Sequence, residues 1–227
     1  MAKLTQSEVW GRKIRQDELA DLGVPTATLA AEAVKAGRVD EALELIEYAT
    51  FEAKKMHDAS VTVIDDFLGY IARHFGEEEI AKMWRECFHH RVAARMALNL
   101  SLEQQVQRYA EDHRGHGADI EVFEEPDRYV LKLNTCGSGT MLRKTRPDLG
   151  ATKEPHPWSW GRTGVPYYCT HCCIGFEIIA TELQGYPARI HECPRKPDEP
   201  CLNYVYKKPE VIPEEYFTRV GKAKSVR

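Results

Sequence analysis

The first half of the chain places apolar residues with the period of an α-helix. Between residues 41 and 74 they recur every three or four positions, at Ala42, Leu45, Ile46, Ala49, Ala53, Met56, Val63, Ile64, Phe67 and Ile71, with Ser60 as the one interruption. This spacing predicts a long helix with a single buried stripe. Gly76 breaks the chain, and a second helix is expected over 77–98. Its apolar stripe contains Ile80, Trp84, Cys87 and Phe88, and Ser101 opens a third helix.

The pattern changes near Gly115, where a period of two replaces the helical period. Residues 120–123 and 129–133 alternate in polarity around the turn EEPD, which predicts a β-hairpin. A loop rich in Pro, Gly and Trp, a helix over 174–183 and two strands, ARIHEC and CLNYVYK, follow. We therefore expect an α+β fold. A helical region, residues 1–115, should pack on an antiparallel sheet-and-helix region, residues 116–227, in one compact unit.

Charge and hydropathy narrow the class of protein. The 227 residues carry a net charge of -4 at pH 7, and the sequence lacks a basic stripe that would bind phosphates. No nucleic-acid partner is therefore expected. The chain has no apolar run that would span a membrane, and its first residues lack the apolar core of a signal peptide. We expect a cytoplasmic protein whose thiols stay reduced. The long helices are compatible with a homodimer.

The stretch YYCTHCCIGF concentrates candidate chemistry in five positions, 169–173. Cys169 and Cys172 form a CxxC pair, and a second group of ligand-type residues follows about twenty positions later. Thiolate and imidazole ligands at such separations favour zinc, with iron as the second choice. The expected metal ligands are Cys169, Cys172, His191 and Cys201, with Cys193 as a substitute.

The spacing leaves several alternatives open. Four protein ligands would make a closed structural site, whereas three would leave a position for a catalytic water. Cys169 and Cys172 could instead be a thioredoxin-like redox pair, because they precede a helix. Cys87 and Cys173 could serve as small buried apolar residues.

A second candidate feature is the glycine-rich turn after the strand over 129–133. Backbone N–H groups of such a turn can hold a carboxylate or an oxyanion, although a plain tight turn is the alternative. Cys136 is either a further metal ligand or a nucleophile, with His171 or His156 as its base. The two tryptophans of the long loop could wall a pocket or pin the loop to the core. The expected substrate-binding residues are Gly137, Ser138, Gly139, Arg143, Trp158 and Trp160.

The C-terminal half resembles the 4-vinyl reductase domain. The similar elements are Cys172-Cys-Ile-Gly-Phe176, a helix, Arg189-Ile-His-Glu-Cys193, and Cys201 before an apolar strand. The order of a helical half and a cysteine-bearing half is also similar to the L-2-amino-thiazoline-4-carboxylate hydrolase family. These resemblances imply a small-molecule pocket, with Cys172, Cys193 and Cys201 at the cysteine positions and Glu192 at the acid. The sequence departs from both patterns where it adds Cys169 and His171 and inserts PRKPDEP.

The leading hypothesis is a zinc-dependent hydrolase or lyase that acts on a small anionic heterocyclic or amide-like molecule. His171 or Glu192 would move protons, and Arg143 would hold the negative group of the substrate. Catalysis through Cys136 as a covalent nucleophile is the variant mechanism. One alternative is a small-molecule sensor or carrier with a structural zinc. Another is a thiol redox protein that uses Cys169 and Cys172.

Overall fold

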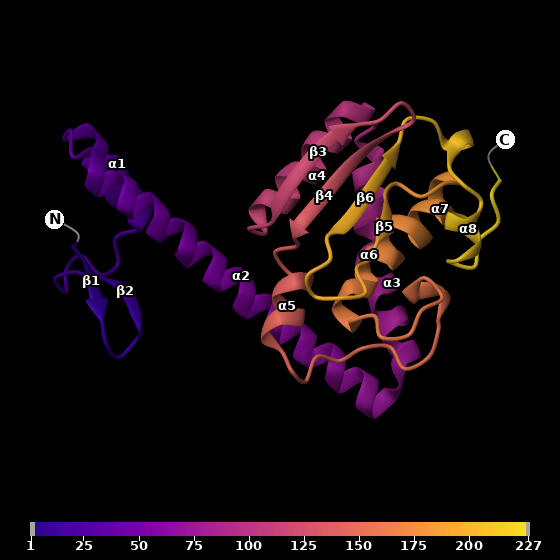
Figure 1. Ribbon diagram of the computed structural model, residues 1–227, viewed down its shortest axis with the longest axis horizontal. Coiled ribbons are helices and arrows are strands. Elements are labelled where there is room, and N and C mark those ends of the chain that lie inside the picture. Colours follow the sequence, from indigo (N-terminus) through magenta and orange to yellow (C-terminus); the bar gives the residue numbers. More distant parts are fainter. Residues whose placement is uncertain (1–2, 226–227) are drawn as a thin grey trace. The chain divides into compact units, whose positions relative to one another are not determined.

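The computed structural model describes residues 3–225, and its elements confirm the α+β class (Figure 1). The chain forms two compact units that divide within helix α2 (Val39–Phe75), the first ending at His57 and the second beginning at Asp58. The expected regions, 1–115 and 116–227, do not coincide with these units. None of the helices within residues 3–225 combines the length and the apolar character that a membrane span needs.

The first unit contains a two-stranded hairpin and two helical segments. Strands β1 (Lys3–Ser7) and β2 (Arg12–Gln16) pair in antiparallel fashion. Helix α1 (Thr26–Lys35) packs on the start of α2 through Ala30, Ala33, Ala42 and Leu45. The side chain of Arg15 ties the hairpin to α1, because its Nη1 donates 2.7 Å hydrogen bonds to the Val24 carbonyl and the Thr26 hydroxyl.

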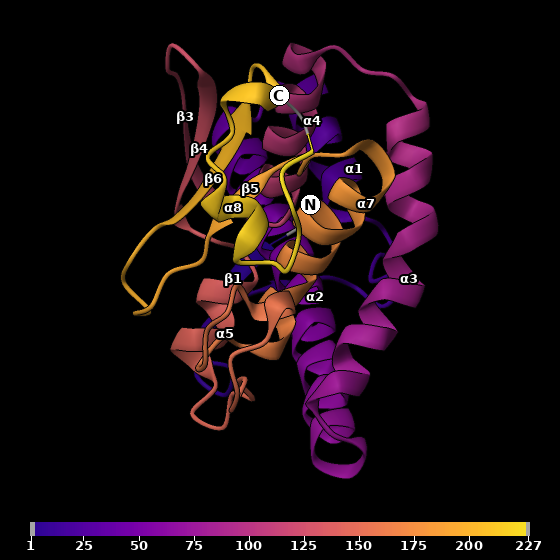
Figure 2. The ribbon, with the colours of Figure 1, turned by 90° about the vertical axis from the view of Figure 1, so that its right-hand side faces the viewer.

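The second unit is built on a four-stranded antiparallel sheet. Strands β3 (Asp119–Glu124), β4 (Arg128–Thr135), β5 (Ile190–Glu192) and β6 (Cys201–Tyr206) take the order β3-β4-β6-β5. Helix α4 (Leu102–Gly115) begins at a capping box between Ser101 and Gln104. It covers one face of the sheet through Val106 and Tyr109, which pack on Leu131, Leu133 and Val205 (Figure 2).

A run of short helices forms the rest of the second unit. Its elements are α5 (Gly139–Thr145), the 3₁₀ turns η1 (Pro157–Ser159) and η2 (Tyr167–Cys169), α6 (Thr170–Cys172), the π-helix η3 (Cys173–Ile179) and α7 (Ala180–Gln184). Helix α3 (Glu77–Ala97) packs against η3 through Trp84. The turn η4 (Pro209–Val211) and helix α8 (Glu215–Thr218) close the chain, and Ile212 and Phe217 pack there on Ile190.

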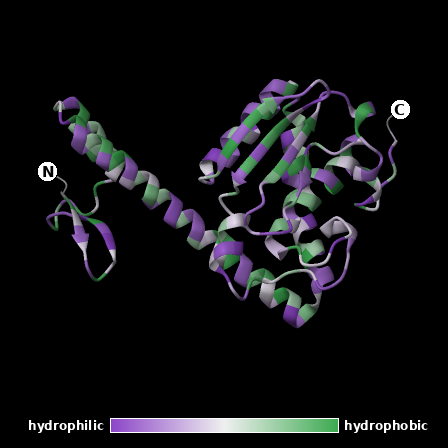
Figure 3. Cartoon of the chain, viewed as in Figure 1, coloured by the Kyte–Doolittle hydropathy of each residue, from purple (hydrophilic) through white to green (hydrophobic). Residues whose placement is uncertain are grey.

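The long helix is confirmed, but the expectation of one buried stripe along it is wrong. Ala42 and Leu45 are buried, whereas Ile46, Met56, Val63, Ile64 and Phe67 are exposed. In the second unit α2 turns a different face inward, with Val61, Asp65 and Leu68 buried. Figure 3 shows hydrophobic and hydrophilic positions intermixed along this helix. Cys87, expected on a buried stripe of α3, is also exposed. The homodimer stays a prediction.

Candidate functional site

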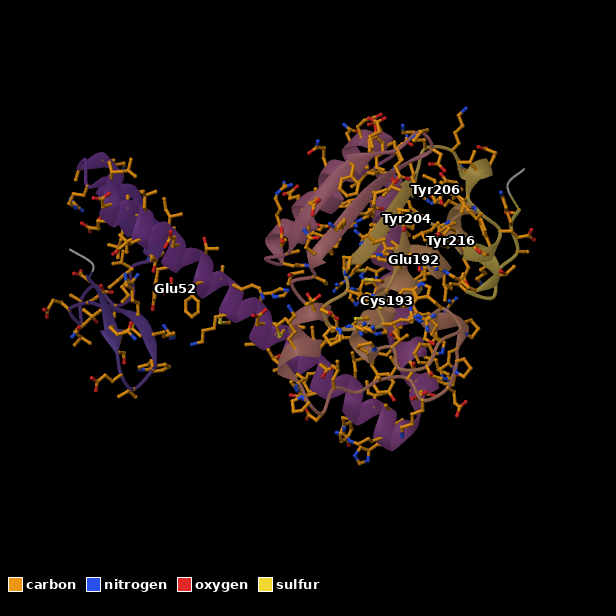
Figure 4. The ribbon with its side chains drawn as sticks, in the orientation of Figure 1. Glu52, Glu192, Cys193, Tyr204, Tyr206 and Tyr216 are labelled. Atoms are coloured by element: carbon orange, nitrogen blue, oxygen red, sulfur yellow. The ribbon has the colours of Figure 1, made fainter. Side chains whose placement is uncertain are left out.

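Five cysteines meet at one end of the sheet because of the strand pairing. Cys201 opens β6 and pairs with Leu133 of β4, so the end of β4, followed by Cys136, lies beside it. Glu192 at the end of β5 pairs with Leu202, so Cys193 comes to the same end (Figure 4). Cys169 and Cys172 approach from η2 and α6. We call these five residues, Cys136, Cys169, Cys172, Cys193 and Cys201, the thiol cluster.

Arg143 of α5 reaches two of these sulfurs. Its Nη2 donates to the sulfur of Cys193 at 3.2 Å and lies 3.8 Å from the sulfur of Cys169. Cys169 and Cys193 are also hydrogen-bonded to each other. The guanidinium therefore binds a pair of thiols that are 24 positions apart in the sequence, at 169 and 193.

The glycine-rich turn is shaped around sulfur. The backbone N–H groups of Ser138, Gly139 and Thr140 form hydrogen bonds with the Cys136 side chain. A Cβ atom at position 139 would lie 2.9 Å from the sulfur of Cys169, so this position accommodates only glycine without a shift of the thiol. A Cβ at Gly137 would lie 1.8 Å from the carbonyl oxygen of His116. The expected binding turn thus directs its donors at Cys136, while Arg143 is directed at two other thiols.

Burial keeps the thiols protonated. It raises the pKa of Cys136, Cys172 and Cys201, and in Cys169 the hydrogen bond to Cys193 and then burial have the same effect. The nearby guanidinium groups act in the opposite direction, because a positive charge favours the thiolate. Arg143 lowers the pKa of Cys169, and Arg189 lowers those of Cys172 and Cys201.

His171 presents a neutral imidazole to the cluster. Its Nδ1 lies 2.5 Å from the carbonyl oxygen of Tyr168, and since a carbonyl can only accept, this contact places the proton on Nδ1. The lone pair of Nε2 then faces the sulfur of Cys172 at 3.4 Å. Burial lowers the pKa of His171 to about 4, and the ring stacks on Phe88. His171 can therefore accept a proton or bind a metal through Nε2.

His191, one of the expected metal ligands, has different partners. Its Nε2 accepts a 3.1 Å hydrogen bond from Nε of Arg189, and its Nδ1 lies 3.4 Å from a carboxylate oxygen of Glu177. The lone pair of its Nε2 is thus used by a guanidinium. Burial lowers the pKa of His191 well below its usual value, so the ring is neutral. His191 therefore positions the guanidinium of Arg189 and is not available as a metal ligand through Nε2.

Arg189 is a buried residue of the candidate site that the sequence analysis missed. It is 3% exposed, donates to His113 at 3.0 Å as well as to His191, and lies over the rings of Phe176 and Tyr109 at 4.1 and 4.5 Å. Within the described part of the chain, no carboxylate pairs with Arg189 or with Arg143. The available signal was a cation within the expected strand ARIHEC, because arginine is rarely buried without a partner.

The remaining expected site residues lie in other surroundings. Glu192 accepts a 2.8 Å hydrogen bond from Arg219 and lies beside Tyr204 and Tyr216 (Figure 4). Trp158 and Trp160 are 6% and 5% exposed and pack in the core, which agrees with the pinning alternative rather than with a pocket wall. His156 binds Glu77 at 2.9 Å. Cys173 is buried in the same core as the tryptophans, which confirms its apolar role.

Among residues 3–225, no three or more Cys, His, Asp or Glu side chains are arranged as a group that could hold a metal ion. Zinc and iron therefore stay proposals. Comparisons with known proteins found no matching family model, no matching curated protein and no matching solved structure.

Proposed function

We propose that the protein is a zinc-dependent hydrolase or lyase that acts on a small anionic heterocyclic or amide-like molecule at the thiol cluster. The observation that carries this proposal is the contact of the half-buried Arg143 with two of five converging thiols. Beside them lies a buried cation, Arg189, that has no acidic partner among the described residues. Both guanidinium groups stay charged at any physiological pH. The surroundings of the thiol cluster therefore stabilise negative charge, on the sulfurs or on a bound group.

The charge balance favours metal-bound thiolates over neutral thiols. A buried cation without a counter-charge costs several kcal/mol. Burial alone raises the pKa of the thiols, so in their neutral form they offer Arg143 and Arg189 no negative charge. A zinc ion with three thiolate ligands carries a net charge of about -1, which the nearby guanidinium groups would offset.

The proposed ligands follow from which donors are available. Cys169, Cys172 and Cys201 remain from the expected set, because the Nε2 of His191 is bonded to Arg189. Three protein ligands leave the fourth position on zinc open for a water. Their sulfurs must turn about χ1 to meet one ion, because they are not arranged as a metal shell. Cys136, whose side chain is held by backbone N–H groups, is left for contact with the substrate.

Side chains around this centre would transfer protons and orient the substrate. Zinc would contribute a Lewis acid that lowers the pKa of a bound water to about 7. His171, neutral and with its Nε2 lone pair directed into the cluster, would accept the proton. Arg143 would hold the anionic group of the substrate. Glu192 is bonded to Arg219 and has no part in this scheme.

Elemental mass spectrometry on protein purified without chelator tests the proposal. We expect about one zinc per chain, since a single cluster supplies the ligands. Cys172→Ser should lose this zinc. Cys87→Ser is the matched control, because Cys87 is exposed on α3 and lies outside the cluster. A native chain without metal, or equal zinc in all three proteins, would contradict the proposal.

A second candidate is a thiol redox protein, favoured by the hydrogen bond between Cys169 and Cys193. The proposed pair differs from the CxxC pair of the sequence analysis, because Arg143 contacts Cys193 rather than Cys172. Mild oxidation with diamide, followed by peptide mapping, would show a reversible disulfide between residues 169 and 193. A disulfide between Cys169 and Cys172 would instead support the original pair, and unreacted thiols would exclude both.

A further inference from the structure

A separate cavity lies in the second unit between α3 and α4. It has a volume of about 710 Å³, which is in the range of sites for small organic molecules. The C-terminal half of α3, the link over 98–100, α4, Phe176 of η3 and residues at and after the end of α7 line it. Figure 2 shows how this link carries the chain from α3 across to α4. None of the thiol cluster residues lines this cavity.

The charged side chains that line the cavity all carry positive charge. Arg91 and Arg95 of α3 and Arg108 of α4 line it, and no aspartate or glutamate is among its lining residues in the described part of the chain. Nη2 of Arg95 donates to Asp112 at 3.0 Å, but its Nη1 is buried and has no hydrogen-bond partner among residues 3–225. An anionic group that enters the cavity would meet the guanidinium groups of these three arginines.

Part of the remaining wall of the cavity is aromatic. Phe88, Tyr109 and Phe176 contribute rings, and the guanidinium of Arg95 lies 5.7 Å from the centres of both the Tyr109 and the Phe176 ring. Rings with guanidinium groups beside them can contact a molecule that has an apolar body and an ionised head. A small inorganic anion would leave the rings unused, and a neutral lipid would leave the cations unused.

We propose that this cavity binds an amphipathic carboxylate, with its head on Arg95, Arg91 and Arg108 and its alkyl or aryl body on the three rings. This inference does not depend on the proposed reaction at the thiol cluster, because the two sites share no proposed ligand-binding residue. Phe176 and Tyr109 contact Arg95 in the cavity and Arg189 beside the thiols, so the two sites are neighbours across these rings.

Isothermal titration of the full chain with decanoate tests the proposal. We expect saturable binding of about one decanoate per chain, and no comparable binding of decyltrimethylammonium, which has a similar body and the opposite charge. Arg91→Gln and Arg108→Gln should each weaken decanoate binding about 10-fold, as expected for the loss of one charge-assisted contact. The matched control is Arg114→Gln, since Arg114 lies exposed on α4 but outside the cavity.

A cavity-filling variant provides a test that leaves the charges in place. Ala94 lines the cavity and is exposed, so Ala94→Trp should block decanoate binding while the thermal midpoint of unfolding stays near that of the native chain. The proposal is overturned if decanoate does not bind, if decyltrimethylammonium binds as tightly, or if Arg91→Gln, Arg108→Gln and Ala94→Trp all bind decanoate like the native chain.

Discussion

The Nη2 atom of Arg143 lies 3.2 Å from the sulfur of Cys193, and this contact joins helix α5 to the end of β5. The same nitrogen lies 3.8 Å from the sulfur of Cys169. Since no carboxylate among the described residues pairs with Arg143, its positive charge acts on the two thiols. Their reactivity should therefore depend on this one side chain.

Replacement of Arg143 by glutamine should slow the alkylation of Cys169. The positive charge lowers the pKa of Cys169, so its loss leaves fewer thiolates at pH 7.5. We expect about a 10-fold lower rate, since a hydrogen bond to a charged group is worth about 1.5–3 kcal/mol. The measurement is timed iodoacetamide labelling, with peptide mass spectrometry to separate the sites. Lys144→Gln, which removes an exposed charge from the same helix, should react like the native chain.

Gly139→Ala should disturb the thiol cluster at its most crowded point. The added methyl group would lie 2.9 Å from the sulfur of Cys169 and 3.8 Å from that of Cys136, so Cys169 must move. Overpacking of this kind costs about 1–3 kcal/mol. Urea unfolding should show this loss in the free energy of unfolding. Gly115→Ala is the control, because a Cβ there meets nothing within 4 Å and its loss of stability should be negligible.

The sequence predicted those features that depend on near neighbours. The helical period of residues 41–74 and the alternation around EEPD are local signals, and they correspond to α2 and to the β3–β4 hairpin. The β1–β2 hairpin was missed, because KLTQS and RKIRQ contain few apolar residues for an alternation to show. The exposed face of α2 was mistaken for a buried one, since periodicity identifies a face but not the element that covers it.

The candidate site depends on pairings over long separations. The cysteines of the cluster were recognised from the sequence as chemical candidates, but their meeting point is set by the antiparallel pairing of β6 with both β4 and β5. Spacing also could not tell the two histidines apart. His171 directs a free nitrogen at Cys172, whereas His191 is bonded to Arg189, and this difference arises from strand β5 and the carbonyl of Tyr168.

Asp65→Asn should stabilise the protein at neutral pH. Asp65 is 3% exposed, its Oδ1 has no hydrogen-bond partner among the described residues, and Arg146 is 3.9 Å from its other oxygen. Burial raises its pKa to about 6, so the folded state holds a proton there more tightly than the unfolded state does. The carboxylate therefore destabilises the fold above pH 6, and this penalty disappears as the pH falls toward 4.

We expect the Asp65→Asn substitution to add about 2 kcal/mol to the free energy of unfolding at pH 7 and to add nothing near pH 4. Urea titrations at the two pH values measure the difference. Asp66→Asn serves as the comparison, because Asp66 forms a 2.6 Å ion pair with Arg146 and its loss should give no gain at pH 7. A gain for Asp65→Asn that is equal at both pH values would show that the carboxylate charge is not its cause.

His113→Gln should make the protein less sensitive to acid. His113 is buried and accepts a hydrogen bond from Nη1 of Arg189, and burial, followed by the charge of Arg189, lowers its pKa to about 3. An unfolded histidine titrates near 6.5, so between about pH 6.5 and 3 the unfolded state binds the extra proton. The neutral ring therefore contributes its full stabilisation above pH 6.5. Below that pH, the free energy of unfolding falls by about 1.4 kcal/mol per pH unit.

Glutamine at position 113 keeps an acceptor for Arg189 but does not titrate. The slope of the unfolding free energy against pH between pH 6 and 4.5 should therefore fall by about this amount. His90→Gln, an exposed position on α3, should keep the native slope, and an unchanged slope in His113→Gln would show that its ring does not control the acid response.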